Sequence, residues 1–280
     1  MLGWGLARLR DLPWRHTRDP WAILVSEAML QQTQVARVLE RWPGFLSEFP
    51  DPATCASAPV GEVIRAWAGL GYNRRAVQLH RTAVACVDRH GGRLPGTLAD
   101  LLALPGIGPY TARAVRAYAF EADEAVVDTN VARVAARVVG RSLTAREAQA
   151  VADGWLPAGE AWAWNQVLMD LGAQVCTARS WRCVVCPLGA KCAWHLGGHV
   201  DPDPAAGSAF VSGGQSRFEG SDRQGRGRLV ARLRDGPLCR AEIPDAAGWP
   251  DDTERTDRIV AGLVRDGLIR VDDDGTARLA

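Results

Sequence analysis

Apolar residues recur at intervals of three and four along most of the first 200 residues, a spacing typical of amphipathic helices. The first such helix is expected from about Trp21 to Trp42, with Asp19 as its N-cap and Pro20 at its first position. An extended lead-in over residues 1–18 is expected to precede it. Further helices are predicted over residues 60–67, 74–89, 112–120, 130–139, 145–156 and 162–171. With short loops and no convincing strand, this part of the chain is predicted to be all-α.

The pattern changes after residue 197. Residues 198–221 are rich in Gly, Ser, Pro and Asp and are predicted to form a linker. Beyond it the spacing predicts two helices and then a β-hairpin with an Asp-Gly turn, over residues 225–233, 253–265, 268–271 and 276–279. Helices followed by a terminal hairpin suggest a small winged-helix-like module over 222–280.

A tight glycine turn lies within Leu104–Ala112, between a helix expected over the apolar run from Leu98 to Leu104 and the helix predicted over 112–120. Pro105 ends the first helix, Gly106 and Gly108 allow a close backbone approach, and Pro109 suits the first position of the next helix. Exposed backbone N–H groups at such a helix start can bind a phosphate. A Gly-x-Gly turn by itself favours an ordinary helix–helix connection, so the rest of the chain decides between the two interpretations.

Composition is that of a globular protein, with 47% apolar and 23% charged residues in 280, enough for one large or two modest domains. No apolar stretch reaches the length that crosses a membrane, and a cytoplasmic protein is expected. The net charge of +1 gives no argument for nucleic acid. The kind of base is more informative, because Lys191 is the only lysine and arginine binds phosphate bidentately and stacks on bases.

Four of the seven cysteines fall within seventeen residues, in the spacing C-x6-C-x2-C-x5-C: Cys176, Cys183, Cys186 and Cys192. In a chain without an export signal, such clustering favours a metal over disulfides. Zinc sites usually carry a short C-x2-C pair at both ends, whereas this loop has only one short pair. Four thiolates from one segment suit a [4Fe–4S] cluster, with a zinc site and free thiols as the alternatives.

Several motifs follow one another between residues 12 and 196: Leu12–Arg15, Ser26–Val35, Gly69–Tyr72, the glycine turn, Val127–Val131, and Asn165–Gly172 leading into the cysteines. Together they resemble the helix-hairpin-helix base-excision glycosylase superfamily, and within it the MutY-type adenine glycosylases. The resemblance implies a two-lobed all-α fold with a [4Fe–4S] loop. It implies a glycosylase domain over 1–197, with a six-helix lobe over about 21–124 and an iron–sulfur lobe formed by 1–20 and 125–197.

The resemblance also implies an activity, the removal of adenine mispaired with 8-oxoguanine or guanine in double-stranded DNA. Such an enzyme is expected to be a monomer that acts at the nucleoid, in the cytoplasm, without membrane association. Cleaving the N-glycosidic bond requires protonation of the leaving base and stabilisation of an oxocarbenium ion. Two carboxylates in environments that push their pKa values apart can supply both.

Glu27 and Asp128 are the candidate carboxylates. Glu27 lies on or beside an apolar helix face, where desolvation is expected to raise its pKa and suit it to general acid catalysis. Asp128 opens a predicted helix, where the dipole favours its ionised form. The resemblance carries base protonation and water activation to Glu27 and stabilisation of the sugar cation to Asp128. The alternatives are a surface ion pair between Glu27 and Arg37, and a plain N-cap at Asp128.

Tyr110 determines the expected subclass. Bifunctional relatives such as endonuclease III carry at this position a lysine that forms a Schiff base and cuts the strand. Here the position is tyrosine, and Lys191 lies in the cysteine loop, so a lysine-based lyase is excluded. The sequence predicts a monofunctional glycosylase in which Tyr110 hydrogen-bonds in the pocket beside Glu27 and Asn130 orients the aspartate or the sugar.

The target base has to leave the DNA stack before it can react. Gln31, Gln32 and Thr33 are predicted to hydrogen-bond base edges, while Leu70 and Tyr72 wedge into the gap. By resemblance these side chains face the opposite, damaged base. The alternatives are helix surface for the two glutamines and core packing for Leu70 and Tyr72.

The hairpin amides from Gly106 to Gly108 are predicted to hold one DNA phosphate. The chain departs from the MutY pattern at Thr129, where the family usually has glycine, and in having no MutT-like C-terminal domain. Weaker discrimination between 8-oxoguanine and guanine is therefore expected. Two rival functions remain: a thymine or uracil mismatch glycosylase, which Glu27 and Tyr110 disfavour, and a non-catalytic iron–sulfur DNA-binding protein, which the two carboxylates disfavour.

Overall fold

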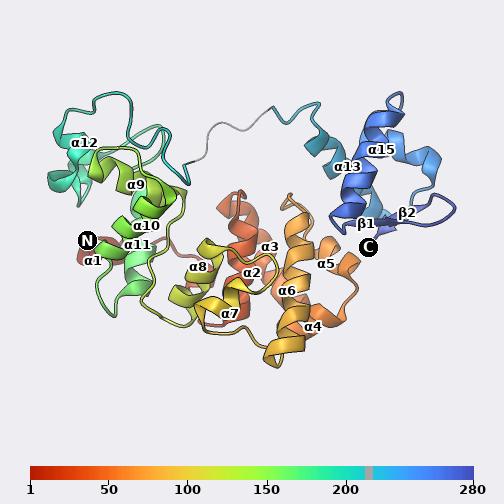
Figure 1. The fold of residues 1–280 in the computed structure, drawn as a ribbon, viewed down its shortest axis with the longest axis horizontal. Helices are drawn as coiled ribbons and strands as arrows, with labels where there is room; N and C mark the ends of the chain where they lie inside the picture. Colours follow the sequence, from red (N-terminus) through yellow and green to blue (C-terminus); the bar gives the residue numbers. More distant parts are fainter. Residues whose placement is uncertain (212–216) are drawn as a thin grey trace. The chain divides into compact units, whose positions relative to one another are not determined.

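The computed structural model describes residues 1–211 and 217–280 and is predominantly helical, as the periodicity predicts (Figure 1). The described residues form two compact units. Unit 1 contains 1–20, 96–98 and 108–211, and unit 2 contains 21–95, 99–107 and 217–280. Residues 108–124, expected in the six-helix lobe, therefore belong to unit 1. No helix in the described part of the chain is long and apolar enough to cross a membrane.

Unit 1 is built around α9 (Thr129–Val139), whose apolar face packs against its neighbours in a core rich in valine and alanine. Those neighbours are α10 (Ala145–Trp155), α11 (Ala161–Gln174) and α12 (Ala193–Leu196). The unit also contains α1 (Leu2–Leu6) and α8 (Pro109–Ala119). A capping box between Thr144 and Glu147 fixes the start of α10.

The N-terminal segment is not the extended lead-in that the sequence suggested. Residues 2–6 form α1, which packs against α11 so closely that a Cβ on Gly5 would lie 2.2 Å from Val167 Cγ1. Arg15 then makes a buried bidentate ion pair with Asp170 of α11, with N···O distances of 2.9 Å. Burial alone would raise the pKa of Asp170, but its hydrogen bonds to Arg15 and Arg10 outweigh it and lower the pKa.

Unit 2 is organised around α2 (Pro20–Leu30), which is buried on every face from Trp21 to Glu27. Two indole N–H groups join α2 to the segment that follows it: Trp42 donates to Ala22 O at 3.0 Å, and Trp21 donates to Phe49 O at 2.9 Å. The remaining helices of the first part of the unit are α3 (Val35–Glu48), α4 (Pro52–Ser57), α5 (Val60–Ala66), α6 (Arg74–His90) and α7 (Leu98–Leu102).

The prediction of a single helix over residues 21–42 is wrong, because the chain forms two helices separated by residues 31–34. Gln32 takes a left-handed conformation with φ of +57°. The backbone can leave the helix here because the Arg75 guanidinium binds the last carbonyls of α2, donating to Ala28 O at 2.7 Å and Met29 O at 2.9 Å. Helical periodicity carries no signal of a cap supplied from 46 residues away.

The C-terminal module, residues 217–280, contains the predicted helices and hairpin. Its elements are α13 (Asp222–Asp235), α14 (Ile243–Ala247), α15 (Thr253–Arg265), β1 (Ile269–Val271) and β2 (Ala277–Leu279). The two strands are antiparallel, with Ile269 opposite Leu279 and Val271 opposite Ala277.

The first half of the predicted linker is packed onto unit 1. Asp203 makes an ion pair with Arg137 of α9, and Ala205 and Ser208 are buried. The part of the predicted linker over 212–216 lies outside the described residues.

Candidate active site and cysteine loop

The glycine turn begins and ends with two glycines that have different roles. Gly106 has a φ of +76°, and a Cβ there would lie 2.7 Å from Gln78 Cβ, so both conformation and packing require glycine. Gly108 is the extended N-cap of α8, and Pro109 takes the first helical position as predicted. No heavy atom lies within 4 Å of a Cβ built on Gly108, so its backbone is open to approach.

Asp128 is the N-cap of α9. Its carboxylate accepts the Val131 backbone N–H at 2.7 Å and the Asn130 side-chain N–H at 2.7 Å. Burial raises the pKa of Asp128, and these hydrogen bonds together with the charge of Arg133 only partly oppose that rise. The start of the helix therefore positions the Asp128 carboxylate. The sequence predicts that the helix dipole favours the ionised form, but in the structure burial outweighs such effects and raises the pKa.

Asn165 fixes the segment that leads to Asp128. Buried on α11, its side chain accepts the Val126 N–H at 2.9 Å and donates to Glu124 O at 2.8 Å. The Asn165 amide thus satisfies backbone groups of this extended segment that a neighbouring strand would otherwise bind. Consequently, Asp128 starts α9 from a segment that is attached to a second helix.

Arg133 is a site residue that sequence reasoning missed. Its guanidinium donates to Asn130 Oδ1 at 2.8 Å, to Gly172 O at 2.6 Å and to Cys176 O at 2.8 Å. Position 172 has to be glycine, because a Cβ there would lie 2.7 Å from Asn130 Cβ. A continuous set of hydrogen bonds thus runs from the Asp128 carboxylate through Asn130 and Arg133 to the backbone of the first cysteine. The spacing of Asn130 and Arg133, three apart on one helix, was the available signal.

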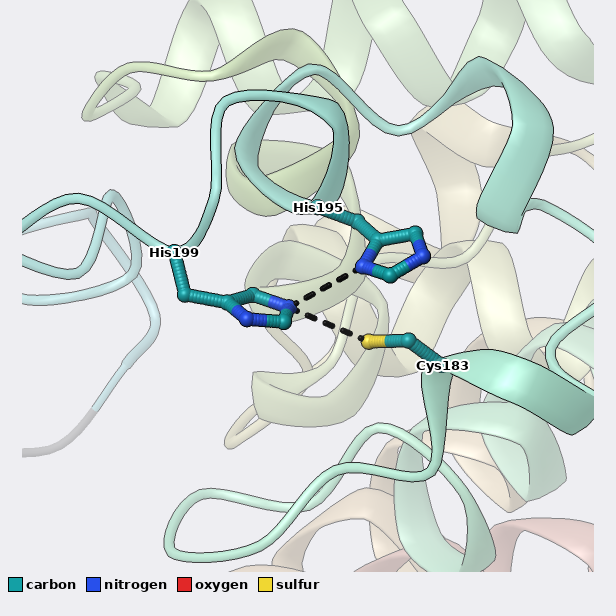
Figure 2. Close-up of side chains that lie close together, drawn as sticks. All are labelled: Cys183, His195 and His199. Atoms are coloured by element: carbon teal, nitrogen blue, oxygen red, sulfur yellow. Dashed lines mark hydrogen bonds between the residues drawn. The ribbon is translucent and has the colours of Figure 1, made fainter.

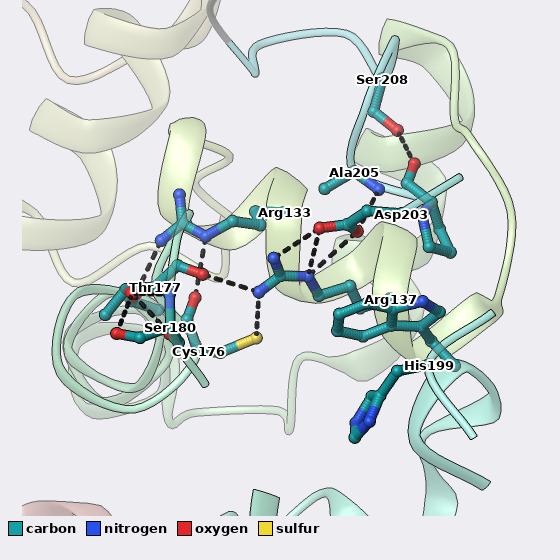
Figure 3. Close-up of polar contacts among 12 residues, drawn as sticks. Arg133, Arg137, Cys176, Thr177, Ser180, His199, Asp203, Ala205 and Ser208 are labelled. Atoms are coloured by element: carbon teal, nitrogen blue, oxygen red, sulfur yellow. Dashed lines mark hydrogen bonds and ion pairs between the residues drawn. The ribbon is translucent and has the colours of Figure 1, made fainter. Parts of the chain in front are cut away.

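The four clustered cysteines line one cavity in unit 1. Beside it lies Arg137, a second residue that sequence reasoning missed, whose side chain is 1% exposed. It donates to Cys176 Sγ at 3.2 Å and makes an ion pair with Asp203 at 2.6 Å (Figure 3). Its guanidinium also lies over the rings of Trp181 and Trp194, 5.3 and 4.7 Å from their centroids. Burial alone would lower the pKa of Arg137, but the hydrogen bonds to Asp203 and Cys176 raise it.

A second donor group adjoins the same loop. His199 Nε2 lies 3.2 Å from His195 Nδ1 and 3.4 Å from Cys183 Sγ, as Figure 2 shows. These three donor atoms all lie within 4.8 Å of one another. The loop therefore offers two overlapping ligand sets that share Cys183.

Glu27 and Tyr110 belong to different units. Glu27 is 5% exposed near the end of α2 in unit 2, in the buried setting that the sequence predicted. Tyr110 is half-buried in the first turn of α8 in unit 1. The structure thus brings together Asp128, Asn130 and the cysteine loop within unit 1, and it assigns Glu27 to unit 2 with the predicted base-reading residues.

Those base-reading residues lie on two neighbouring loops of unit 2. The first loop carries Gln31 and Gln32, both exposed, and Thr33, whose hydroxyl donates to Leu70 O of the second loop at 3.2 Å. On the second loop Leu70 is 3% exposed, whereas Tyr72 is 42% exposed with a φ of +45°. In this structure Leu70 is packed in the core, and Tyr72 presents its ring at the surface.

Arg75 joins the two loops and also escaped sequence reasoning. Besides capping α2, its guanidinium donates to Thr33 Oγ1 at 2.9 Å, Leu70 O at 3.2 Å and Gly71 O at 3.1 Å. It also lies 5.5 Å from the Tyr72 ring centroid. Burial lowers the pKa of Arg75 to about 10, which leaves it charged at neutral pH. One buried cation thus sets the positions of both predicted reading loops.

A glycine turn at a helix start, an aspartate that caps a following helix and a loop with four cysteines are together typical of base-excision DNA glycosylases. The chain belongs to the HhH-GPD superfamily of base excision DNA repair proteins, whose family model matches residues 25–157. It is 43% identical to an adenine DNA glycosylase of Mycobacterium tuberculosis, over 98% of this chain and 90% of that protein. It is 42% identical to the Mycolicibacterium smegmatis adenine DNA glycosylase, over 100% and 94%.

Two solved structures share the fold. A thermostable thymine-DNA glycosylase superposes with a TM-score of 0.67 and 32% identity, covering 70% of this chain and 93% of that one. A non-covalent endonuclease III–DNA complex superposes with a TM-score of 0.62 over 70% and 92%, and at 22% identity it supports the fold alone. The predicted helix-hairpin-helix fold class is confirmed.

Proposed function

We propose that this protein is a monofunctional adenine DNA glycosylase that acts, as a monomer in the cytoplasm, on adenine opposite 8-oxoguanine or guanine in double-stranded DNA. The observation that carries the proposal is the carboxylate of Asp128, held by Asn130 and by the first turn of α9. Adenine as the substrate is supported by the mycobacterial adenine DNA glycosylases, which align with nearly the whole chain.

In the proposed reaction Glu27 donates a proton to a ring nitrogen of adenine, and the N-glycosidic electron pair leaves with the base. Asp128, as a carboxylate, stabilises the oxocarbenium ion that remains on the sugar. Asn130 keeps that carboxylate oriented through the bond it donates. Glu27, now ionised, takes a proton from the water that adds to the sugar carbon. The products are free adenine and an abasic site in an uncut strand.

Tyr110 supports the absence of a lyase step. A Schiff base needs a primary amine, and Lys191, the only lysine, is exposed in the cysteine loop. In the proposal Tyr110 supplies a hydroxyl to the base pocket beside Glu27. Strand cleavage therefore requires added alkali.

The proposed DNA contacts follow the exposure of the candidate residues. Gly106 and Gly108 present hairpin amides to one phosphate. Gln31 and Gln32, which are exposed, read base edges from the first reading loop, whereas the Thr33 hydroxyl bonds to Leu70 O and Arg75 and supports that loop. In the second loop the ring that enters the stack is proposed to be that of Tyr72, because Leu70 is buried and supports the loop from below.

We propose a [4Fe–4S] cluster as the cofactor, held by Cys176, Cys183, Cys186 and Cys192. A tetrahedral zinc site with Zn–S bonds of about 2.3 Å would bring the sulfurs to about 3.8 Å from one another. Among the described residues, only Cys183, His195 and His199 form a group of donor atoms that all lie within 4.8 Å of one another. The four cysteine sulfurs are therefore spread more widely than the four ligands of one zinc ion. That wider spacing, around one cavity, fits a cluster of several irons. When bound, the cluster would fix the loop that carries Cys176, whose carbonyl accepts from Arg133.

The two overlapping ligand sets predict different metal contents for two variants. Cys186→Ser is expected to lose the iron, since Cys186 belongs only to the four-cysteine set. His199→Ala is expected to keep about four irons and four sulfides per chain. Iron, zinc and acid-labile sulfide analysis of the purified proteins measures this. Zinc in the wild type that disappears with His199→Ala would instead identify the Cys183, His195 and His199 group as the metal site.

A panel of labelled duplexes tests the proposed substrate. Adenine, thymine or uracil is placed opposite 8-oxoguanine or guanine, and abasic sites are revealed with alkali. Adenine is expected to be removed opposite both partners. Removal of thymine or uracil without adenine would favour the mismatch rival, whose fold neighbour is 32% identical.

A further inference from the structure

The C-terminal module packs directly on α5 and α6 within unit 2. A Cβ on Gly61 of α5 would lie 2.9 Å from the backbone oxygen of Ala280. A Cβ on Gly267, between α15 and β1, would lie 3.5 Å from Val77 Cγ1 of α6. Arg74, the first residue of α6, lies 3.8 Å from the Asp266 carboxylate. These contacts lie on α5 and α6, which are joined by a loop over residues 67–73.

Arg234, near the end of α13, extends from the module to that loop. Its guanidinium donates to the Asn73 side-chain oxygen at 3.0 Å and to Ile64 O at 3.3 Å. Its own carbonyl accepts from Arg65 Nε at 3.4 Å. Burial lowers the pKa of Arg234, consistent with a guanidinium taken out of water at this contact.

Asn73 directly follows Tyr72, so the second reading loop is held on both sides. Before Tyr72, the carbonyls of Leu70 and Gly71 accept from Arg75. After it, the Asn73 side chain accepts from Arg234. Between these two attachments Tyr72 keeps a φ of +45°, a region that a residue with a side chain occupies only when its surroundings impose it.

The charge of the module gives no reason to assign it a DNA groove of its own. Residues 217–280 contain twelve arginines, no lysine and thirteen aspartates and glutamates. Many of these pair locally, as Arg226 does with Asp266 and Arg255 with Asp222. A module that binds the phosphate backbone by itself requires a basic face.

We propose that the C-terminal module is a positioning element for opposite-base reading, with Arg234 acting through Asn73 to hold Tyr72 in its exposed conformation. The proposal rests on the proposed function, because Tyr72 has a base to read only in a DNA glycosylase. It assigns to this module a role in specificity without contact between the module and DNA.

The test is a double-mutant cycle in the full chain with Arg234→Ala, Asn73→Ala and the double variant. Asn73→Ala removes the bond while leaving the module untouched, and Asn73 makes no side-chain cap bond to α6 that would be lost with it. Arg232→Ala is the matched control, an exposed arginine on the same helix whose contact is with Asp235. The probe is a duplex with 2′-fluoroadenosine, which resists excision, opposite 8-oxoguanine or guanine. Hydrogen exchange of residues 69–73 is measured in parallel without DNA.

Each single variant is expected to weaken binding to the 8-oxoguanine duplex roughly three- to tenfold, the size of one lost hydrogen bond, and to affect the guanine duplex less. The double variant should be no weaker than either single one. Exchange at 69–73 should rise in Arg234→Ala and Asn73→Ala but not in Arg232→Ala. Unchanged exchange and binding in Asn73→Ala would overturn the proposal. A wild type that removes no adenine would overturn the proposed function while leaving the exchange result valid.

Discussion

Asp128→Asn is expected to abolish adenine excision, by roughly 100- to 1000-fold or more, while the protein stays folded. Asparagine caps a helix about as well as aspartate, so the bond from Val131 N–H at 2.7 Å has a replacement acceptor. What the variant removes is the negative charge that we propose to stabilise the sugar cation. Single-turnover excision and thermal unfolding of the same preparation measure the two effects. Glu160→Gln, at an exposed helix N-cap that makes no side-chain cap bond, is the control.

The pKa of Asp128 gives this variant a pH signature. A carboxyl group with a raised pKa in the folded state contributes stability below its unfolded pKa, and that contribution is lost as the pH rises through the folded value. Burial raises the pKa of Asp128, so the wild type should lose stability relative to Asp128→Asn as the pH rises through that value. Excision should change in the opposite sense, falling as acid protonates Asp128. An acid limb that persists in a partly active Asp128→Asn would rule out this assignment.

Glu27→Gln is expected to lower excision by roughly 100- to 10,000-fold, because glutamine cannot protonate the leaving base. The substitution keeps the shape of a side chain that is 5% exposed, so the fold and the affinity for the duplex should change little. Excision rates and binding to a duplex with 2′-fluoroadenosine separate the two effects. Glu40→Gln, on the exposed face of α3, is the control. Unchanged excision by Glu27→Gln would remove the general acid from the proposed mechanism.

Local signals in the sequence were sufficient where one short segment determines its own structure. Pro109 starts α8, and Asp128 caps α9, because proline at the first position and a capping carboxylate act within one helical turn. The helix predicted over 253–265 agrees with α15 at both ends. At its start, the Asp252 side chain accepts the Arg255 N–H. The four cysteines that the sequence groups into one candidate metal site also line one cavity.

The sequence failed where the deciding partner is distant. The break after α2 depends on Arg75, and the Asp203 pair that fixes half of the predicted linker depends on Arg137. Periodicity treats both arginines as ordinary polar positions on a helix. Arg133 is a similar case, since its role follows from a close helix crossing that Gly172 allows. Buried guanidinium groups fix the positions of much of the site, and each of them donates to backbone carbonyls. Every residue type has such a carbonyl, so the sequence does not reveal which one is the partner.

Free adenine and strand integrity, measured together on one duplex with adenine opposite 8-oxoguanine, test the central claim most directly. Chromatography follows the released base, and a denaturing gel follows the labelled strand with and without alkali. We expect stoichiometric adenine, an intact strand before alkali and a cut strand after it, with no borohydride-trapped adduct. A strand cut without alkali and trapped by borohydride, or no release of adenine, would contradict it.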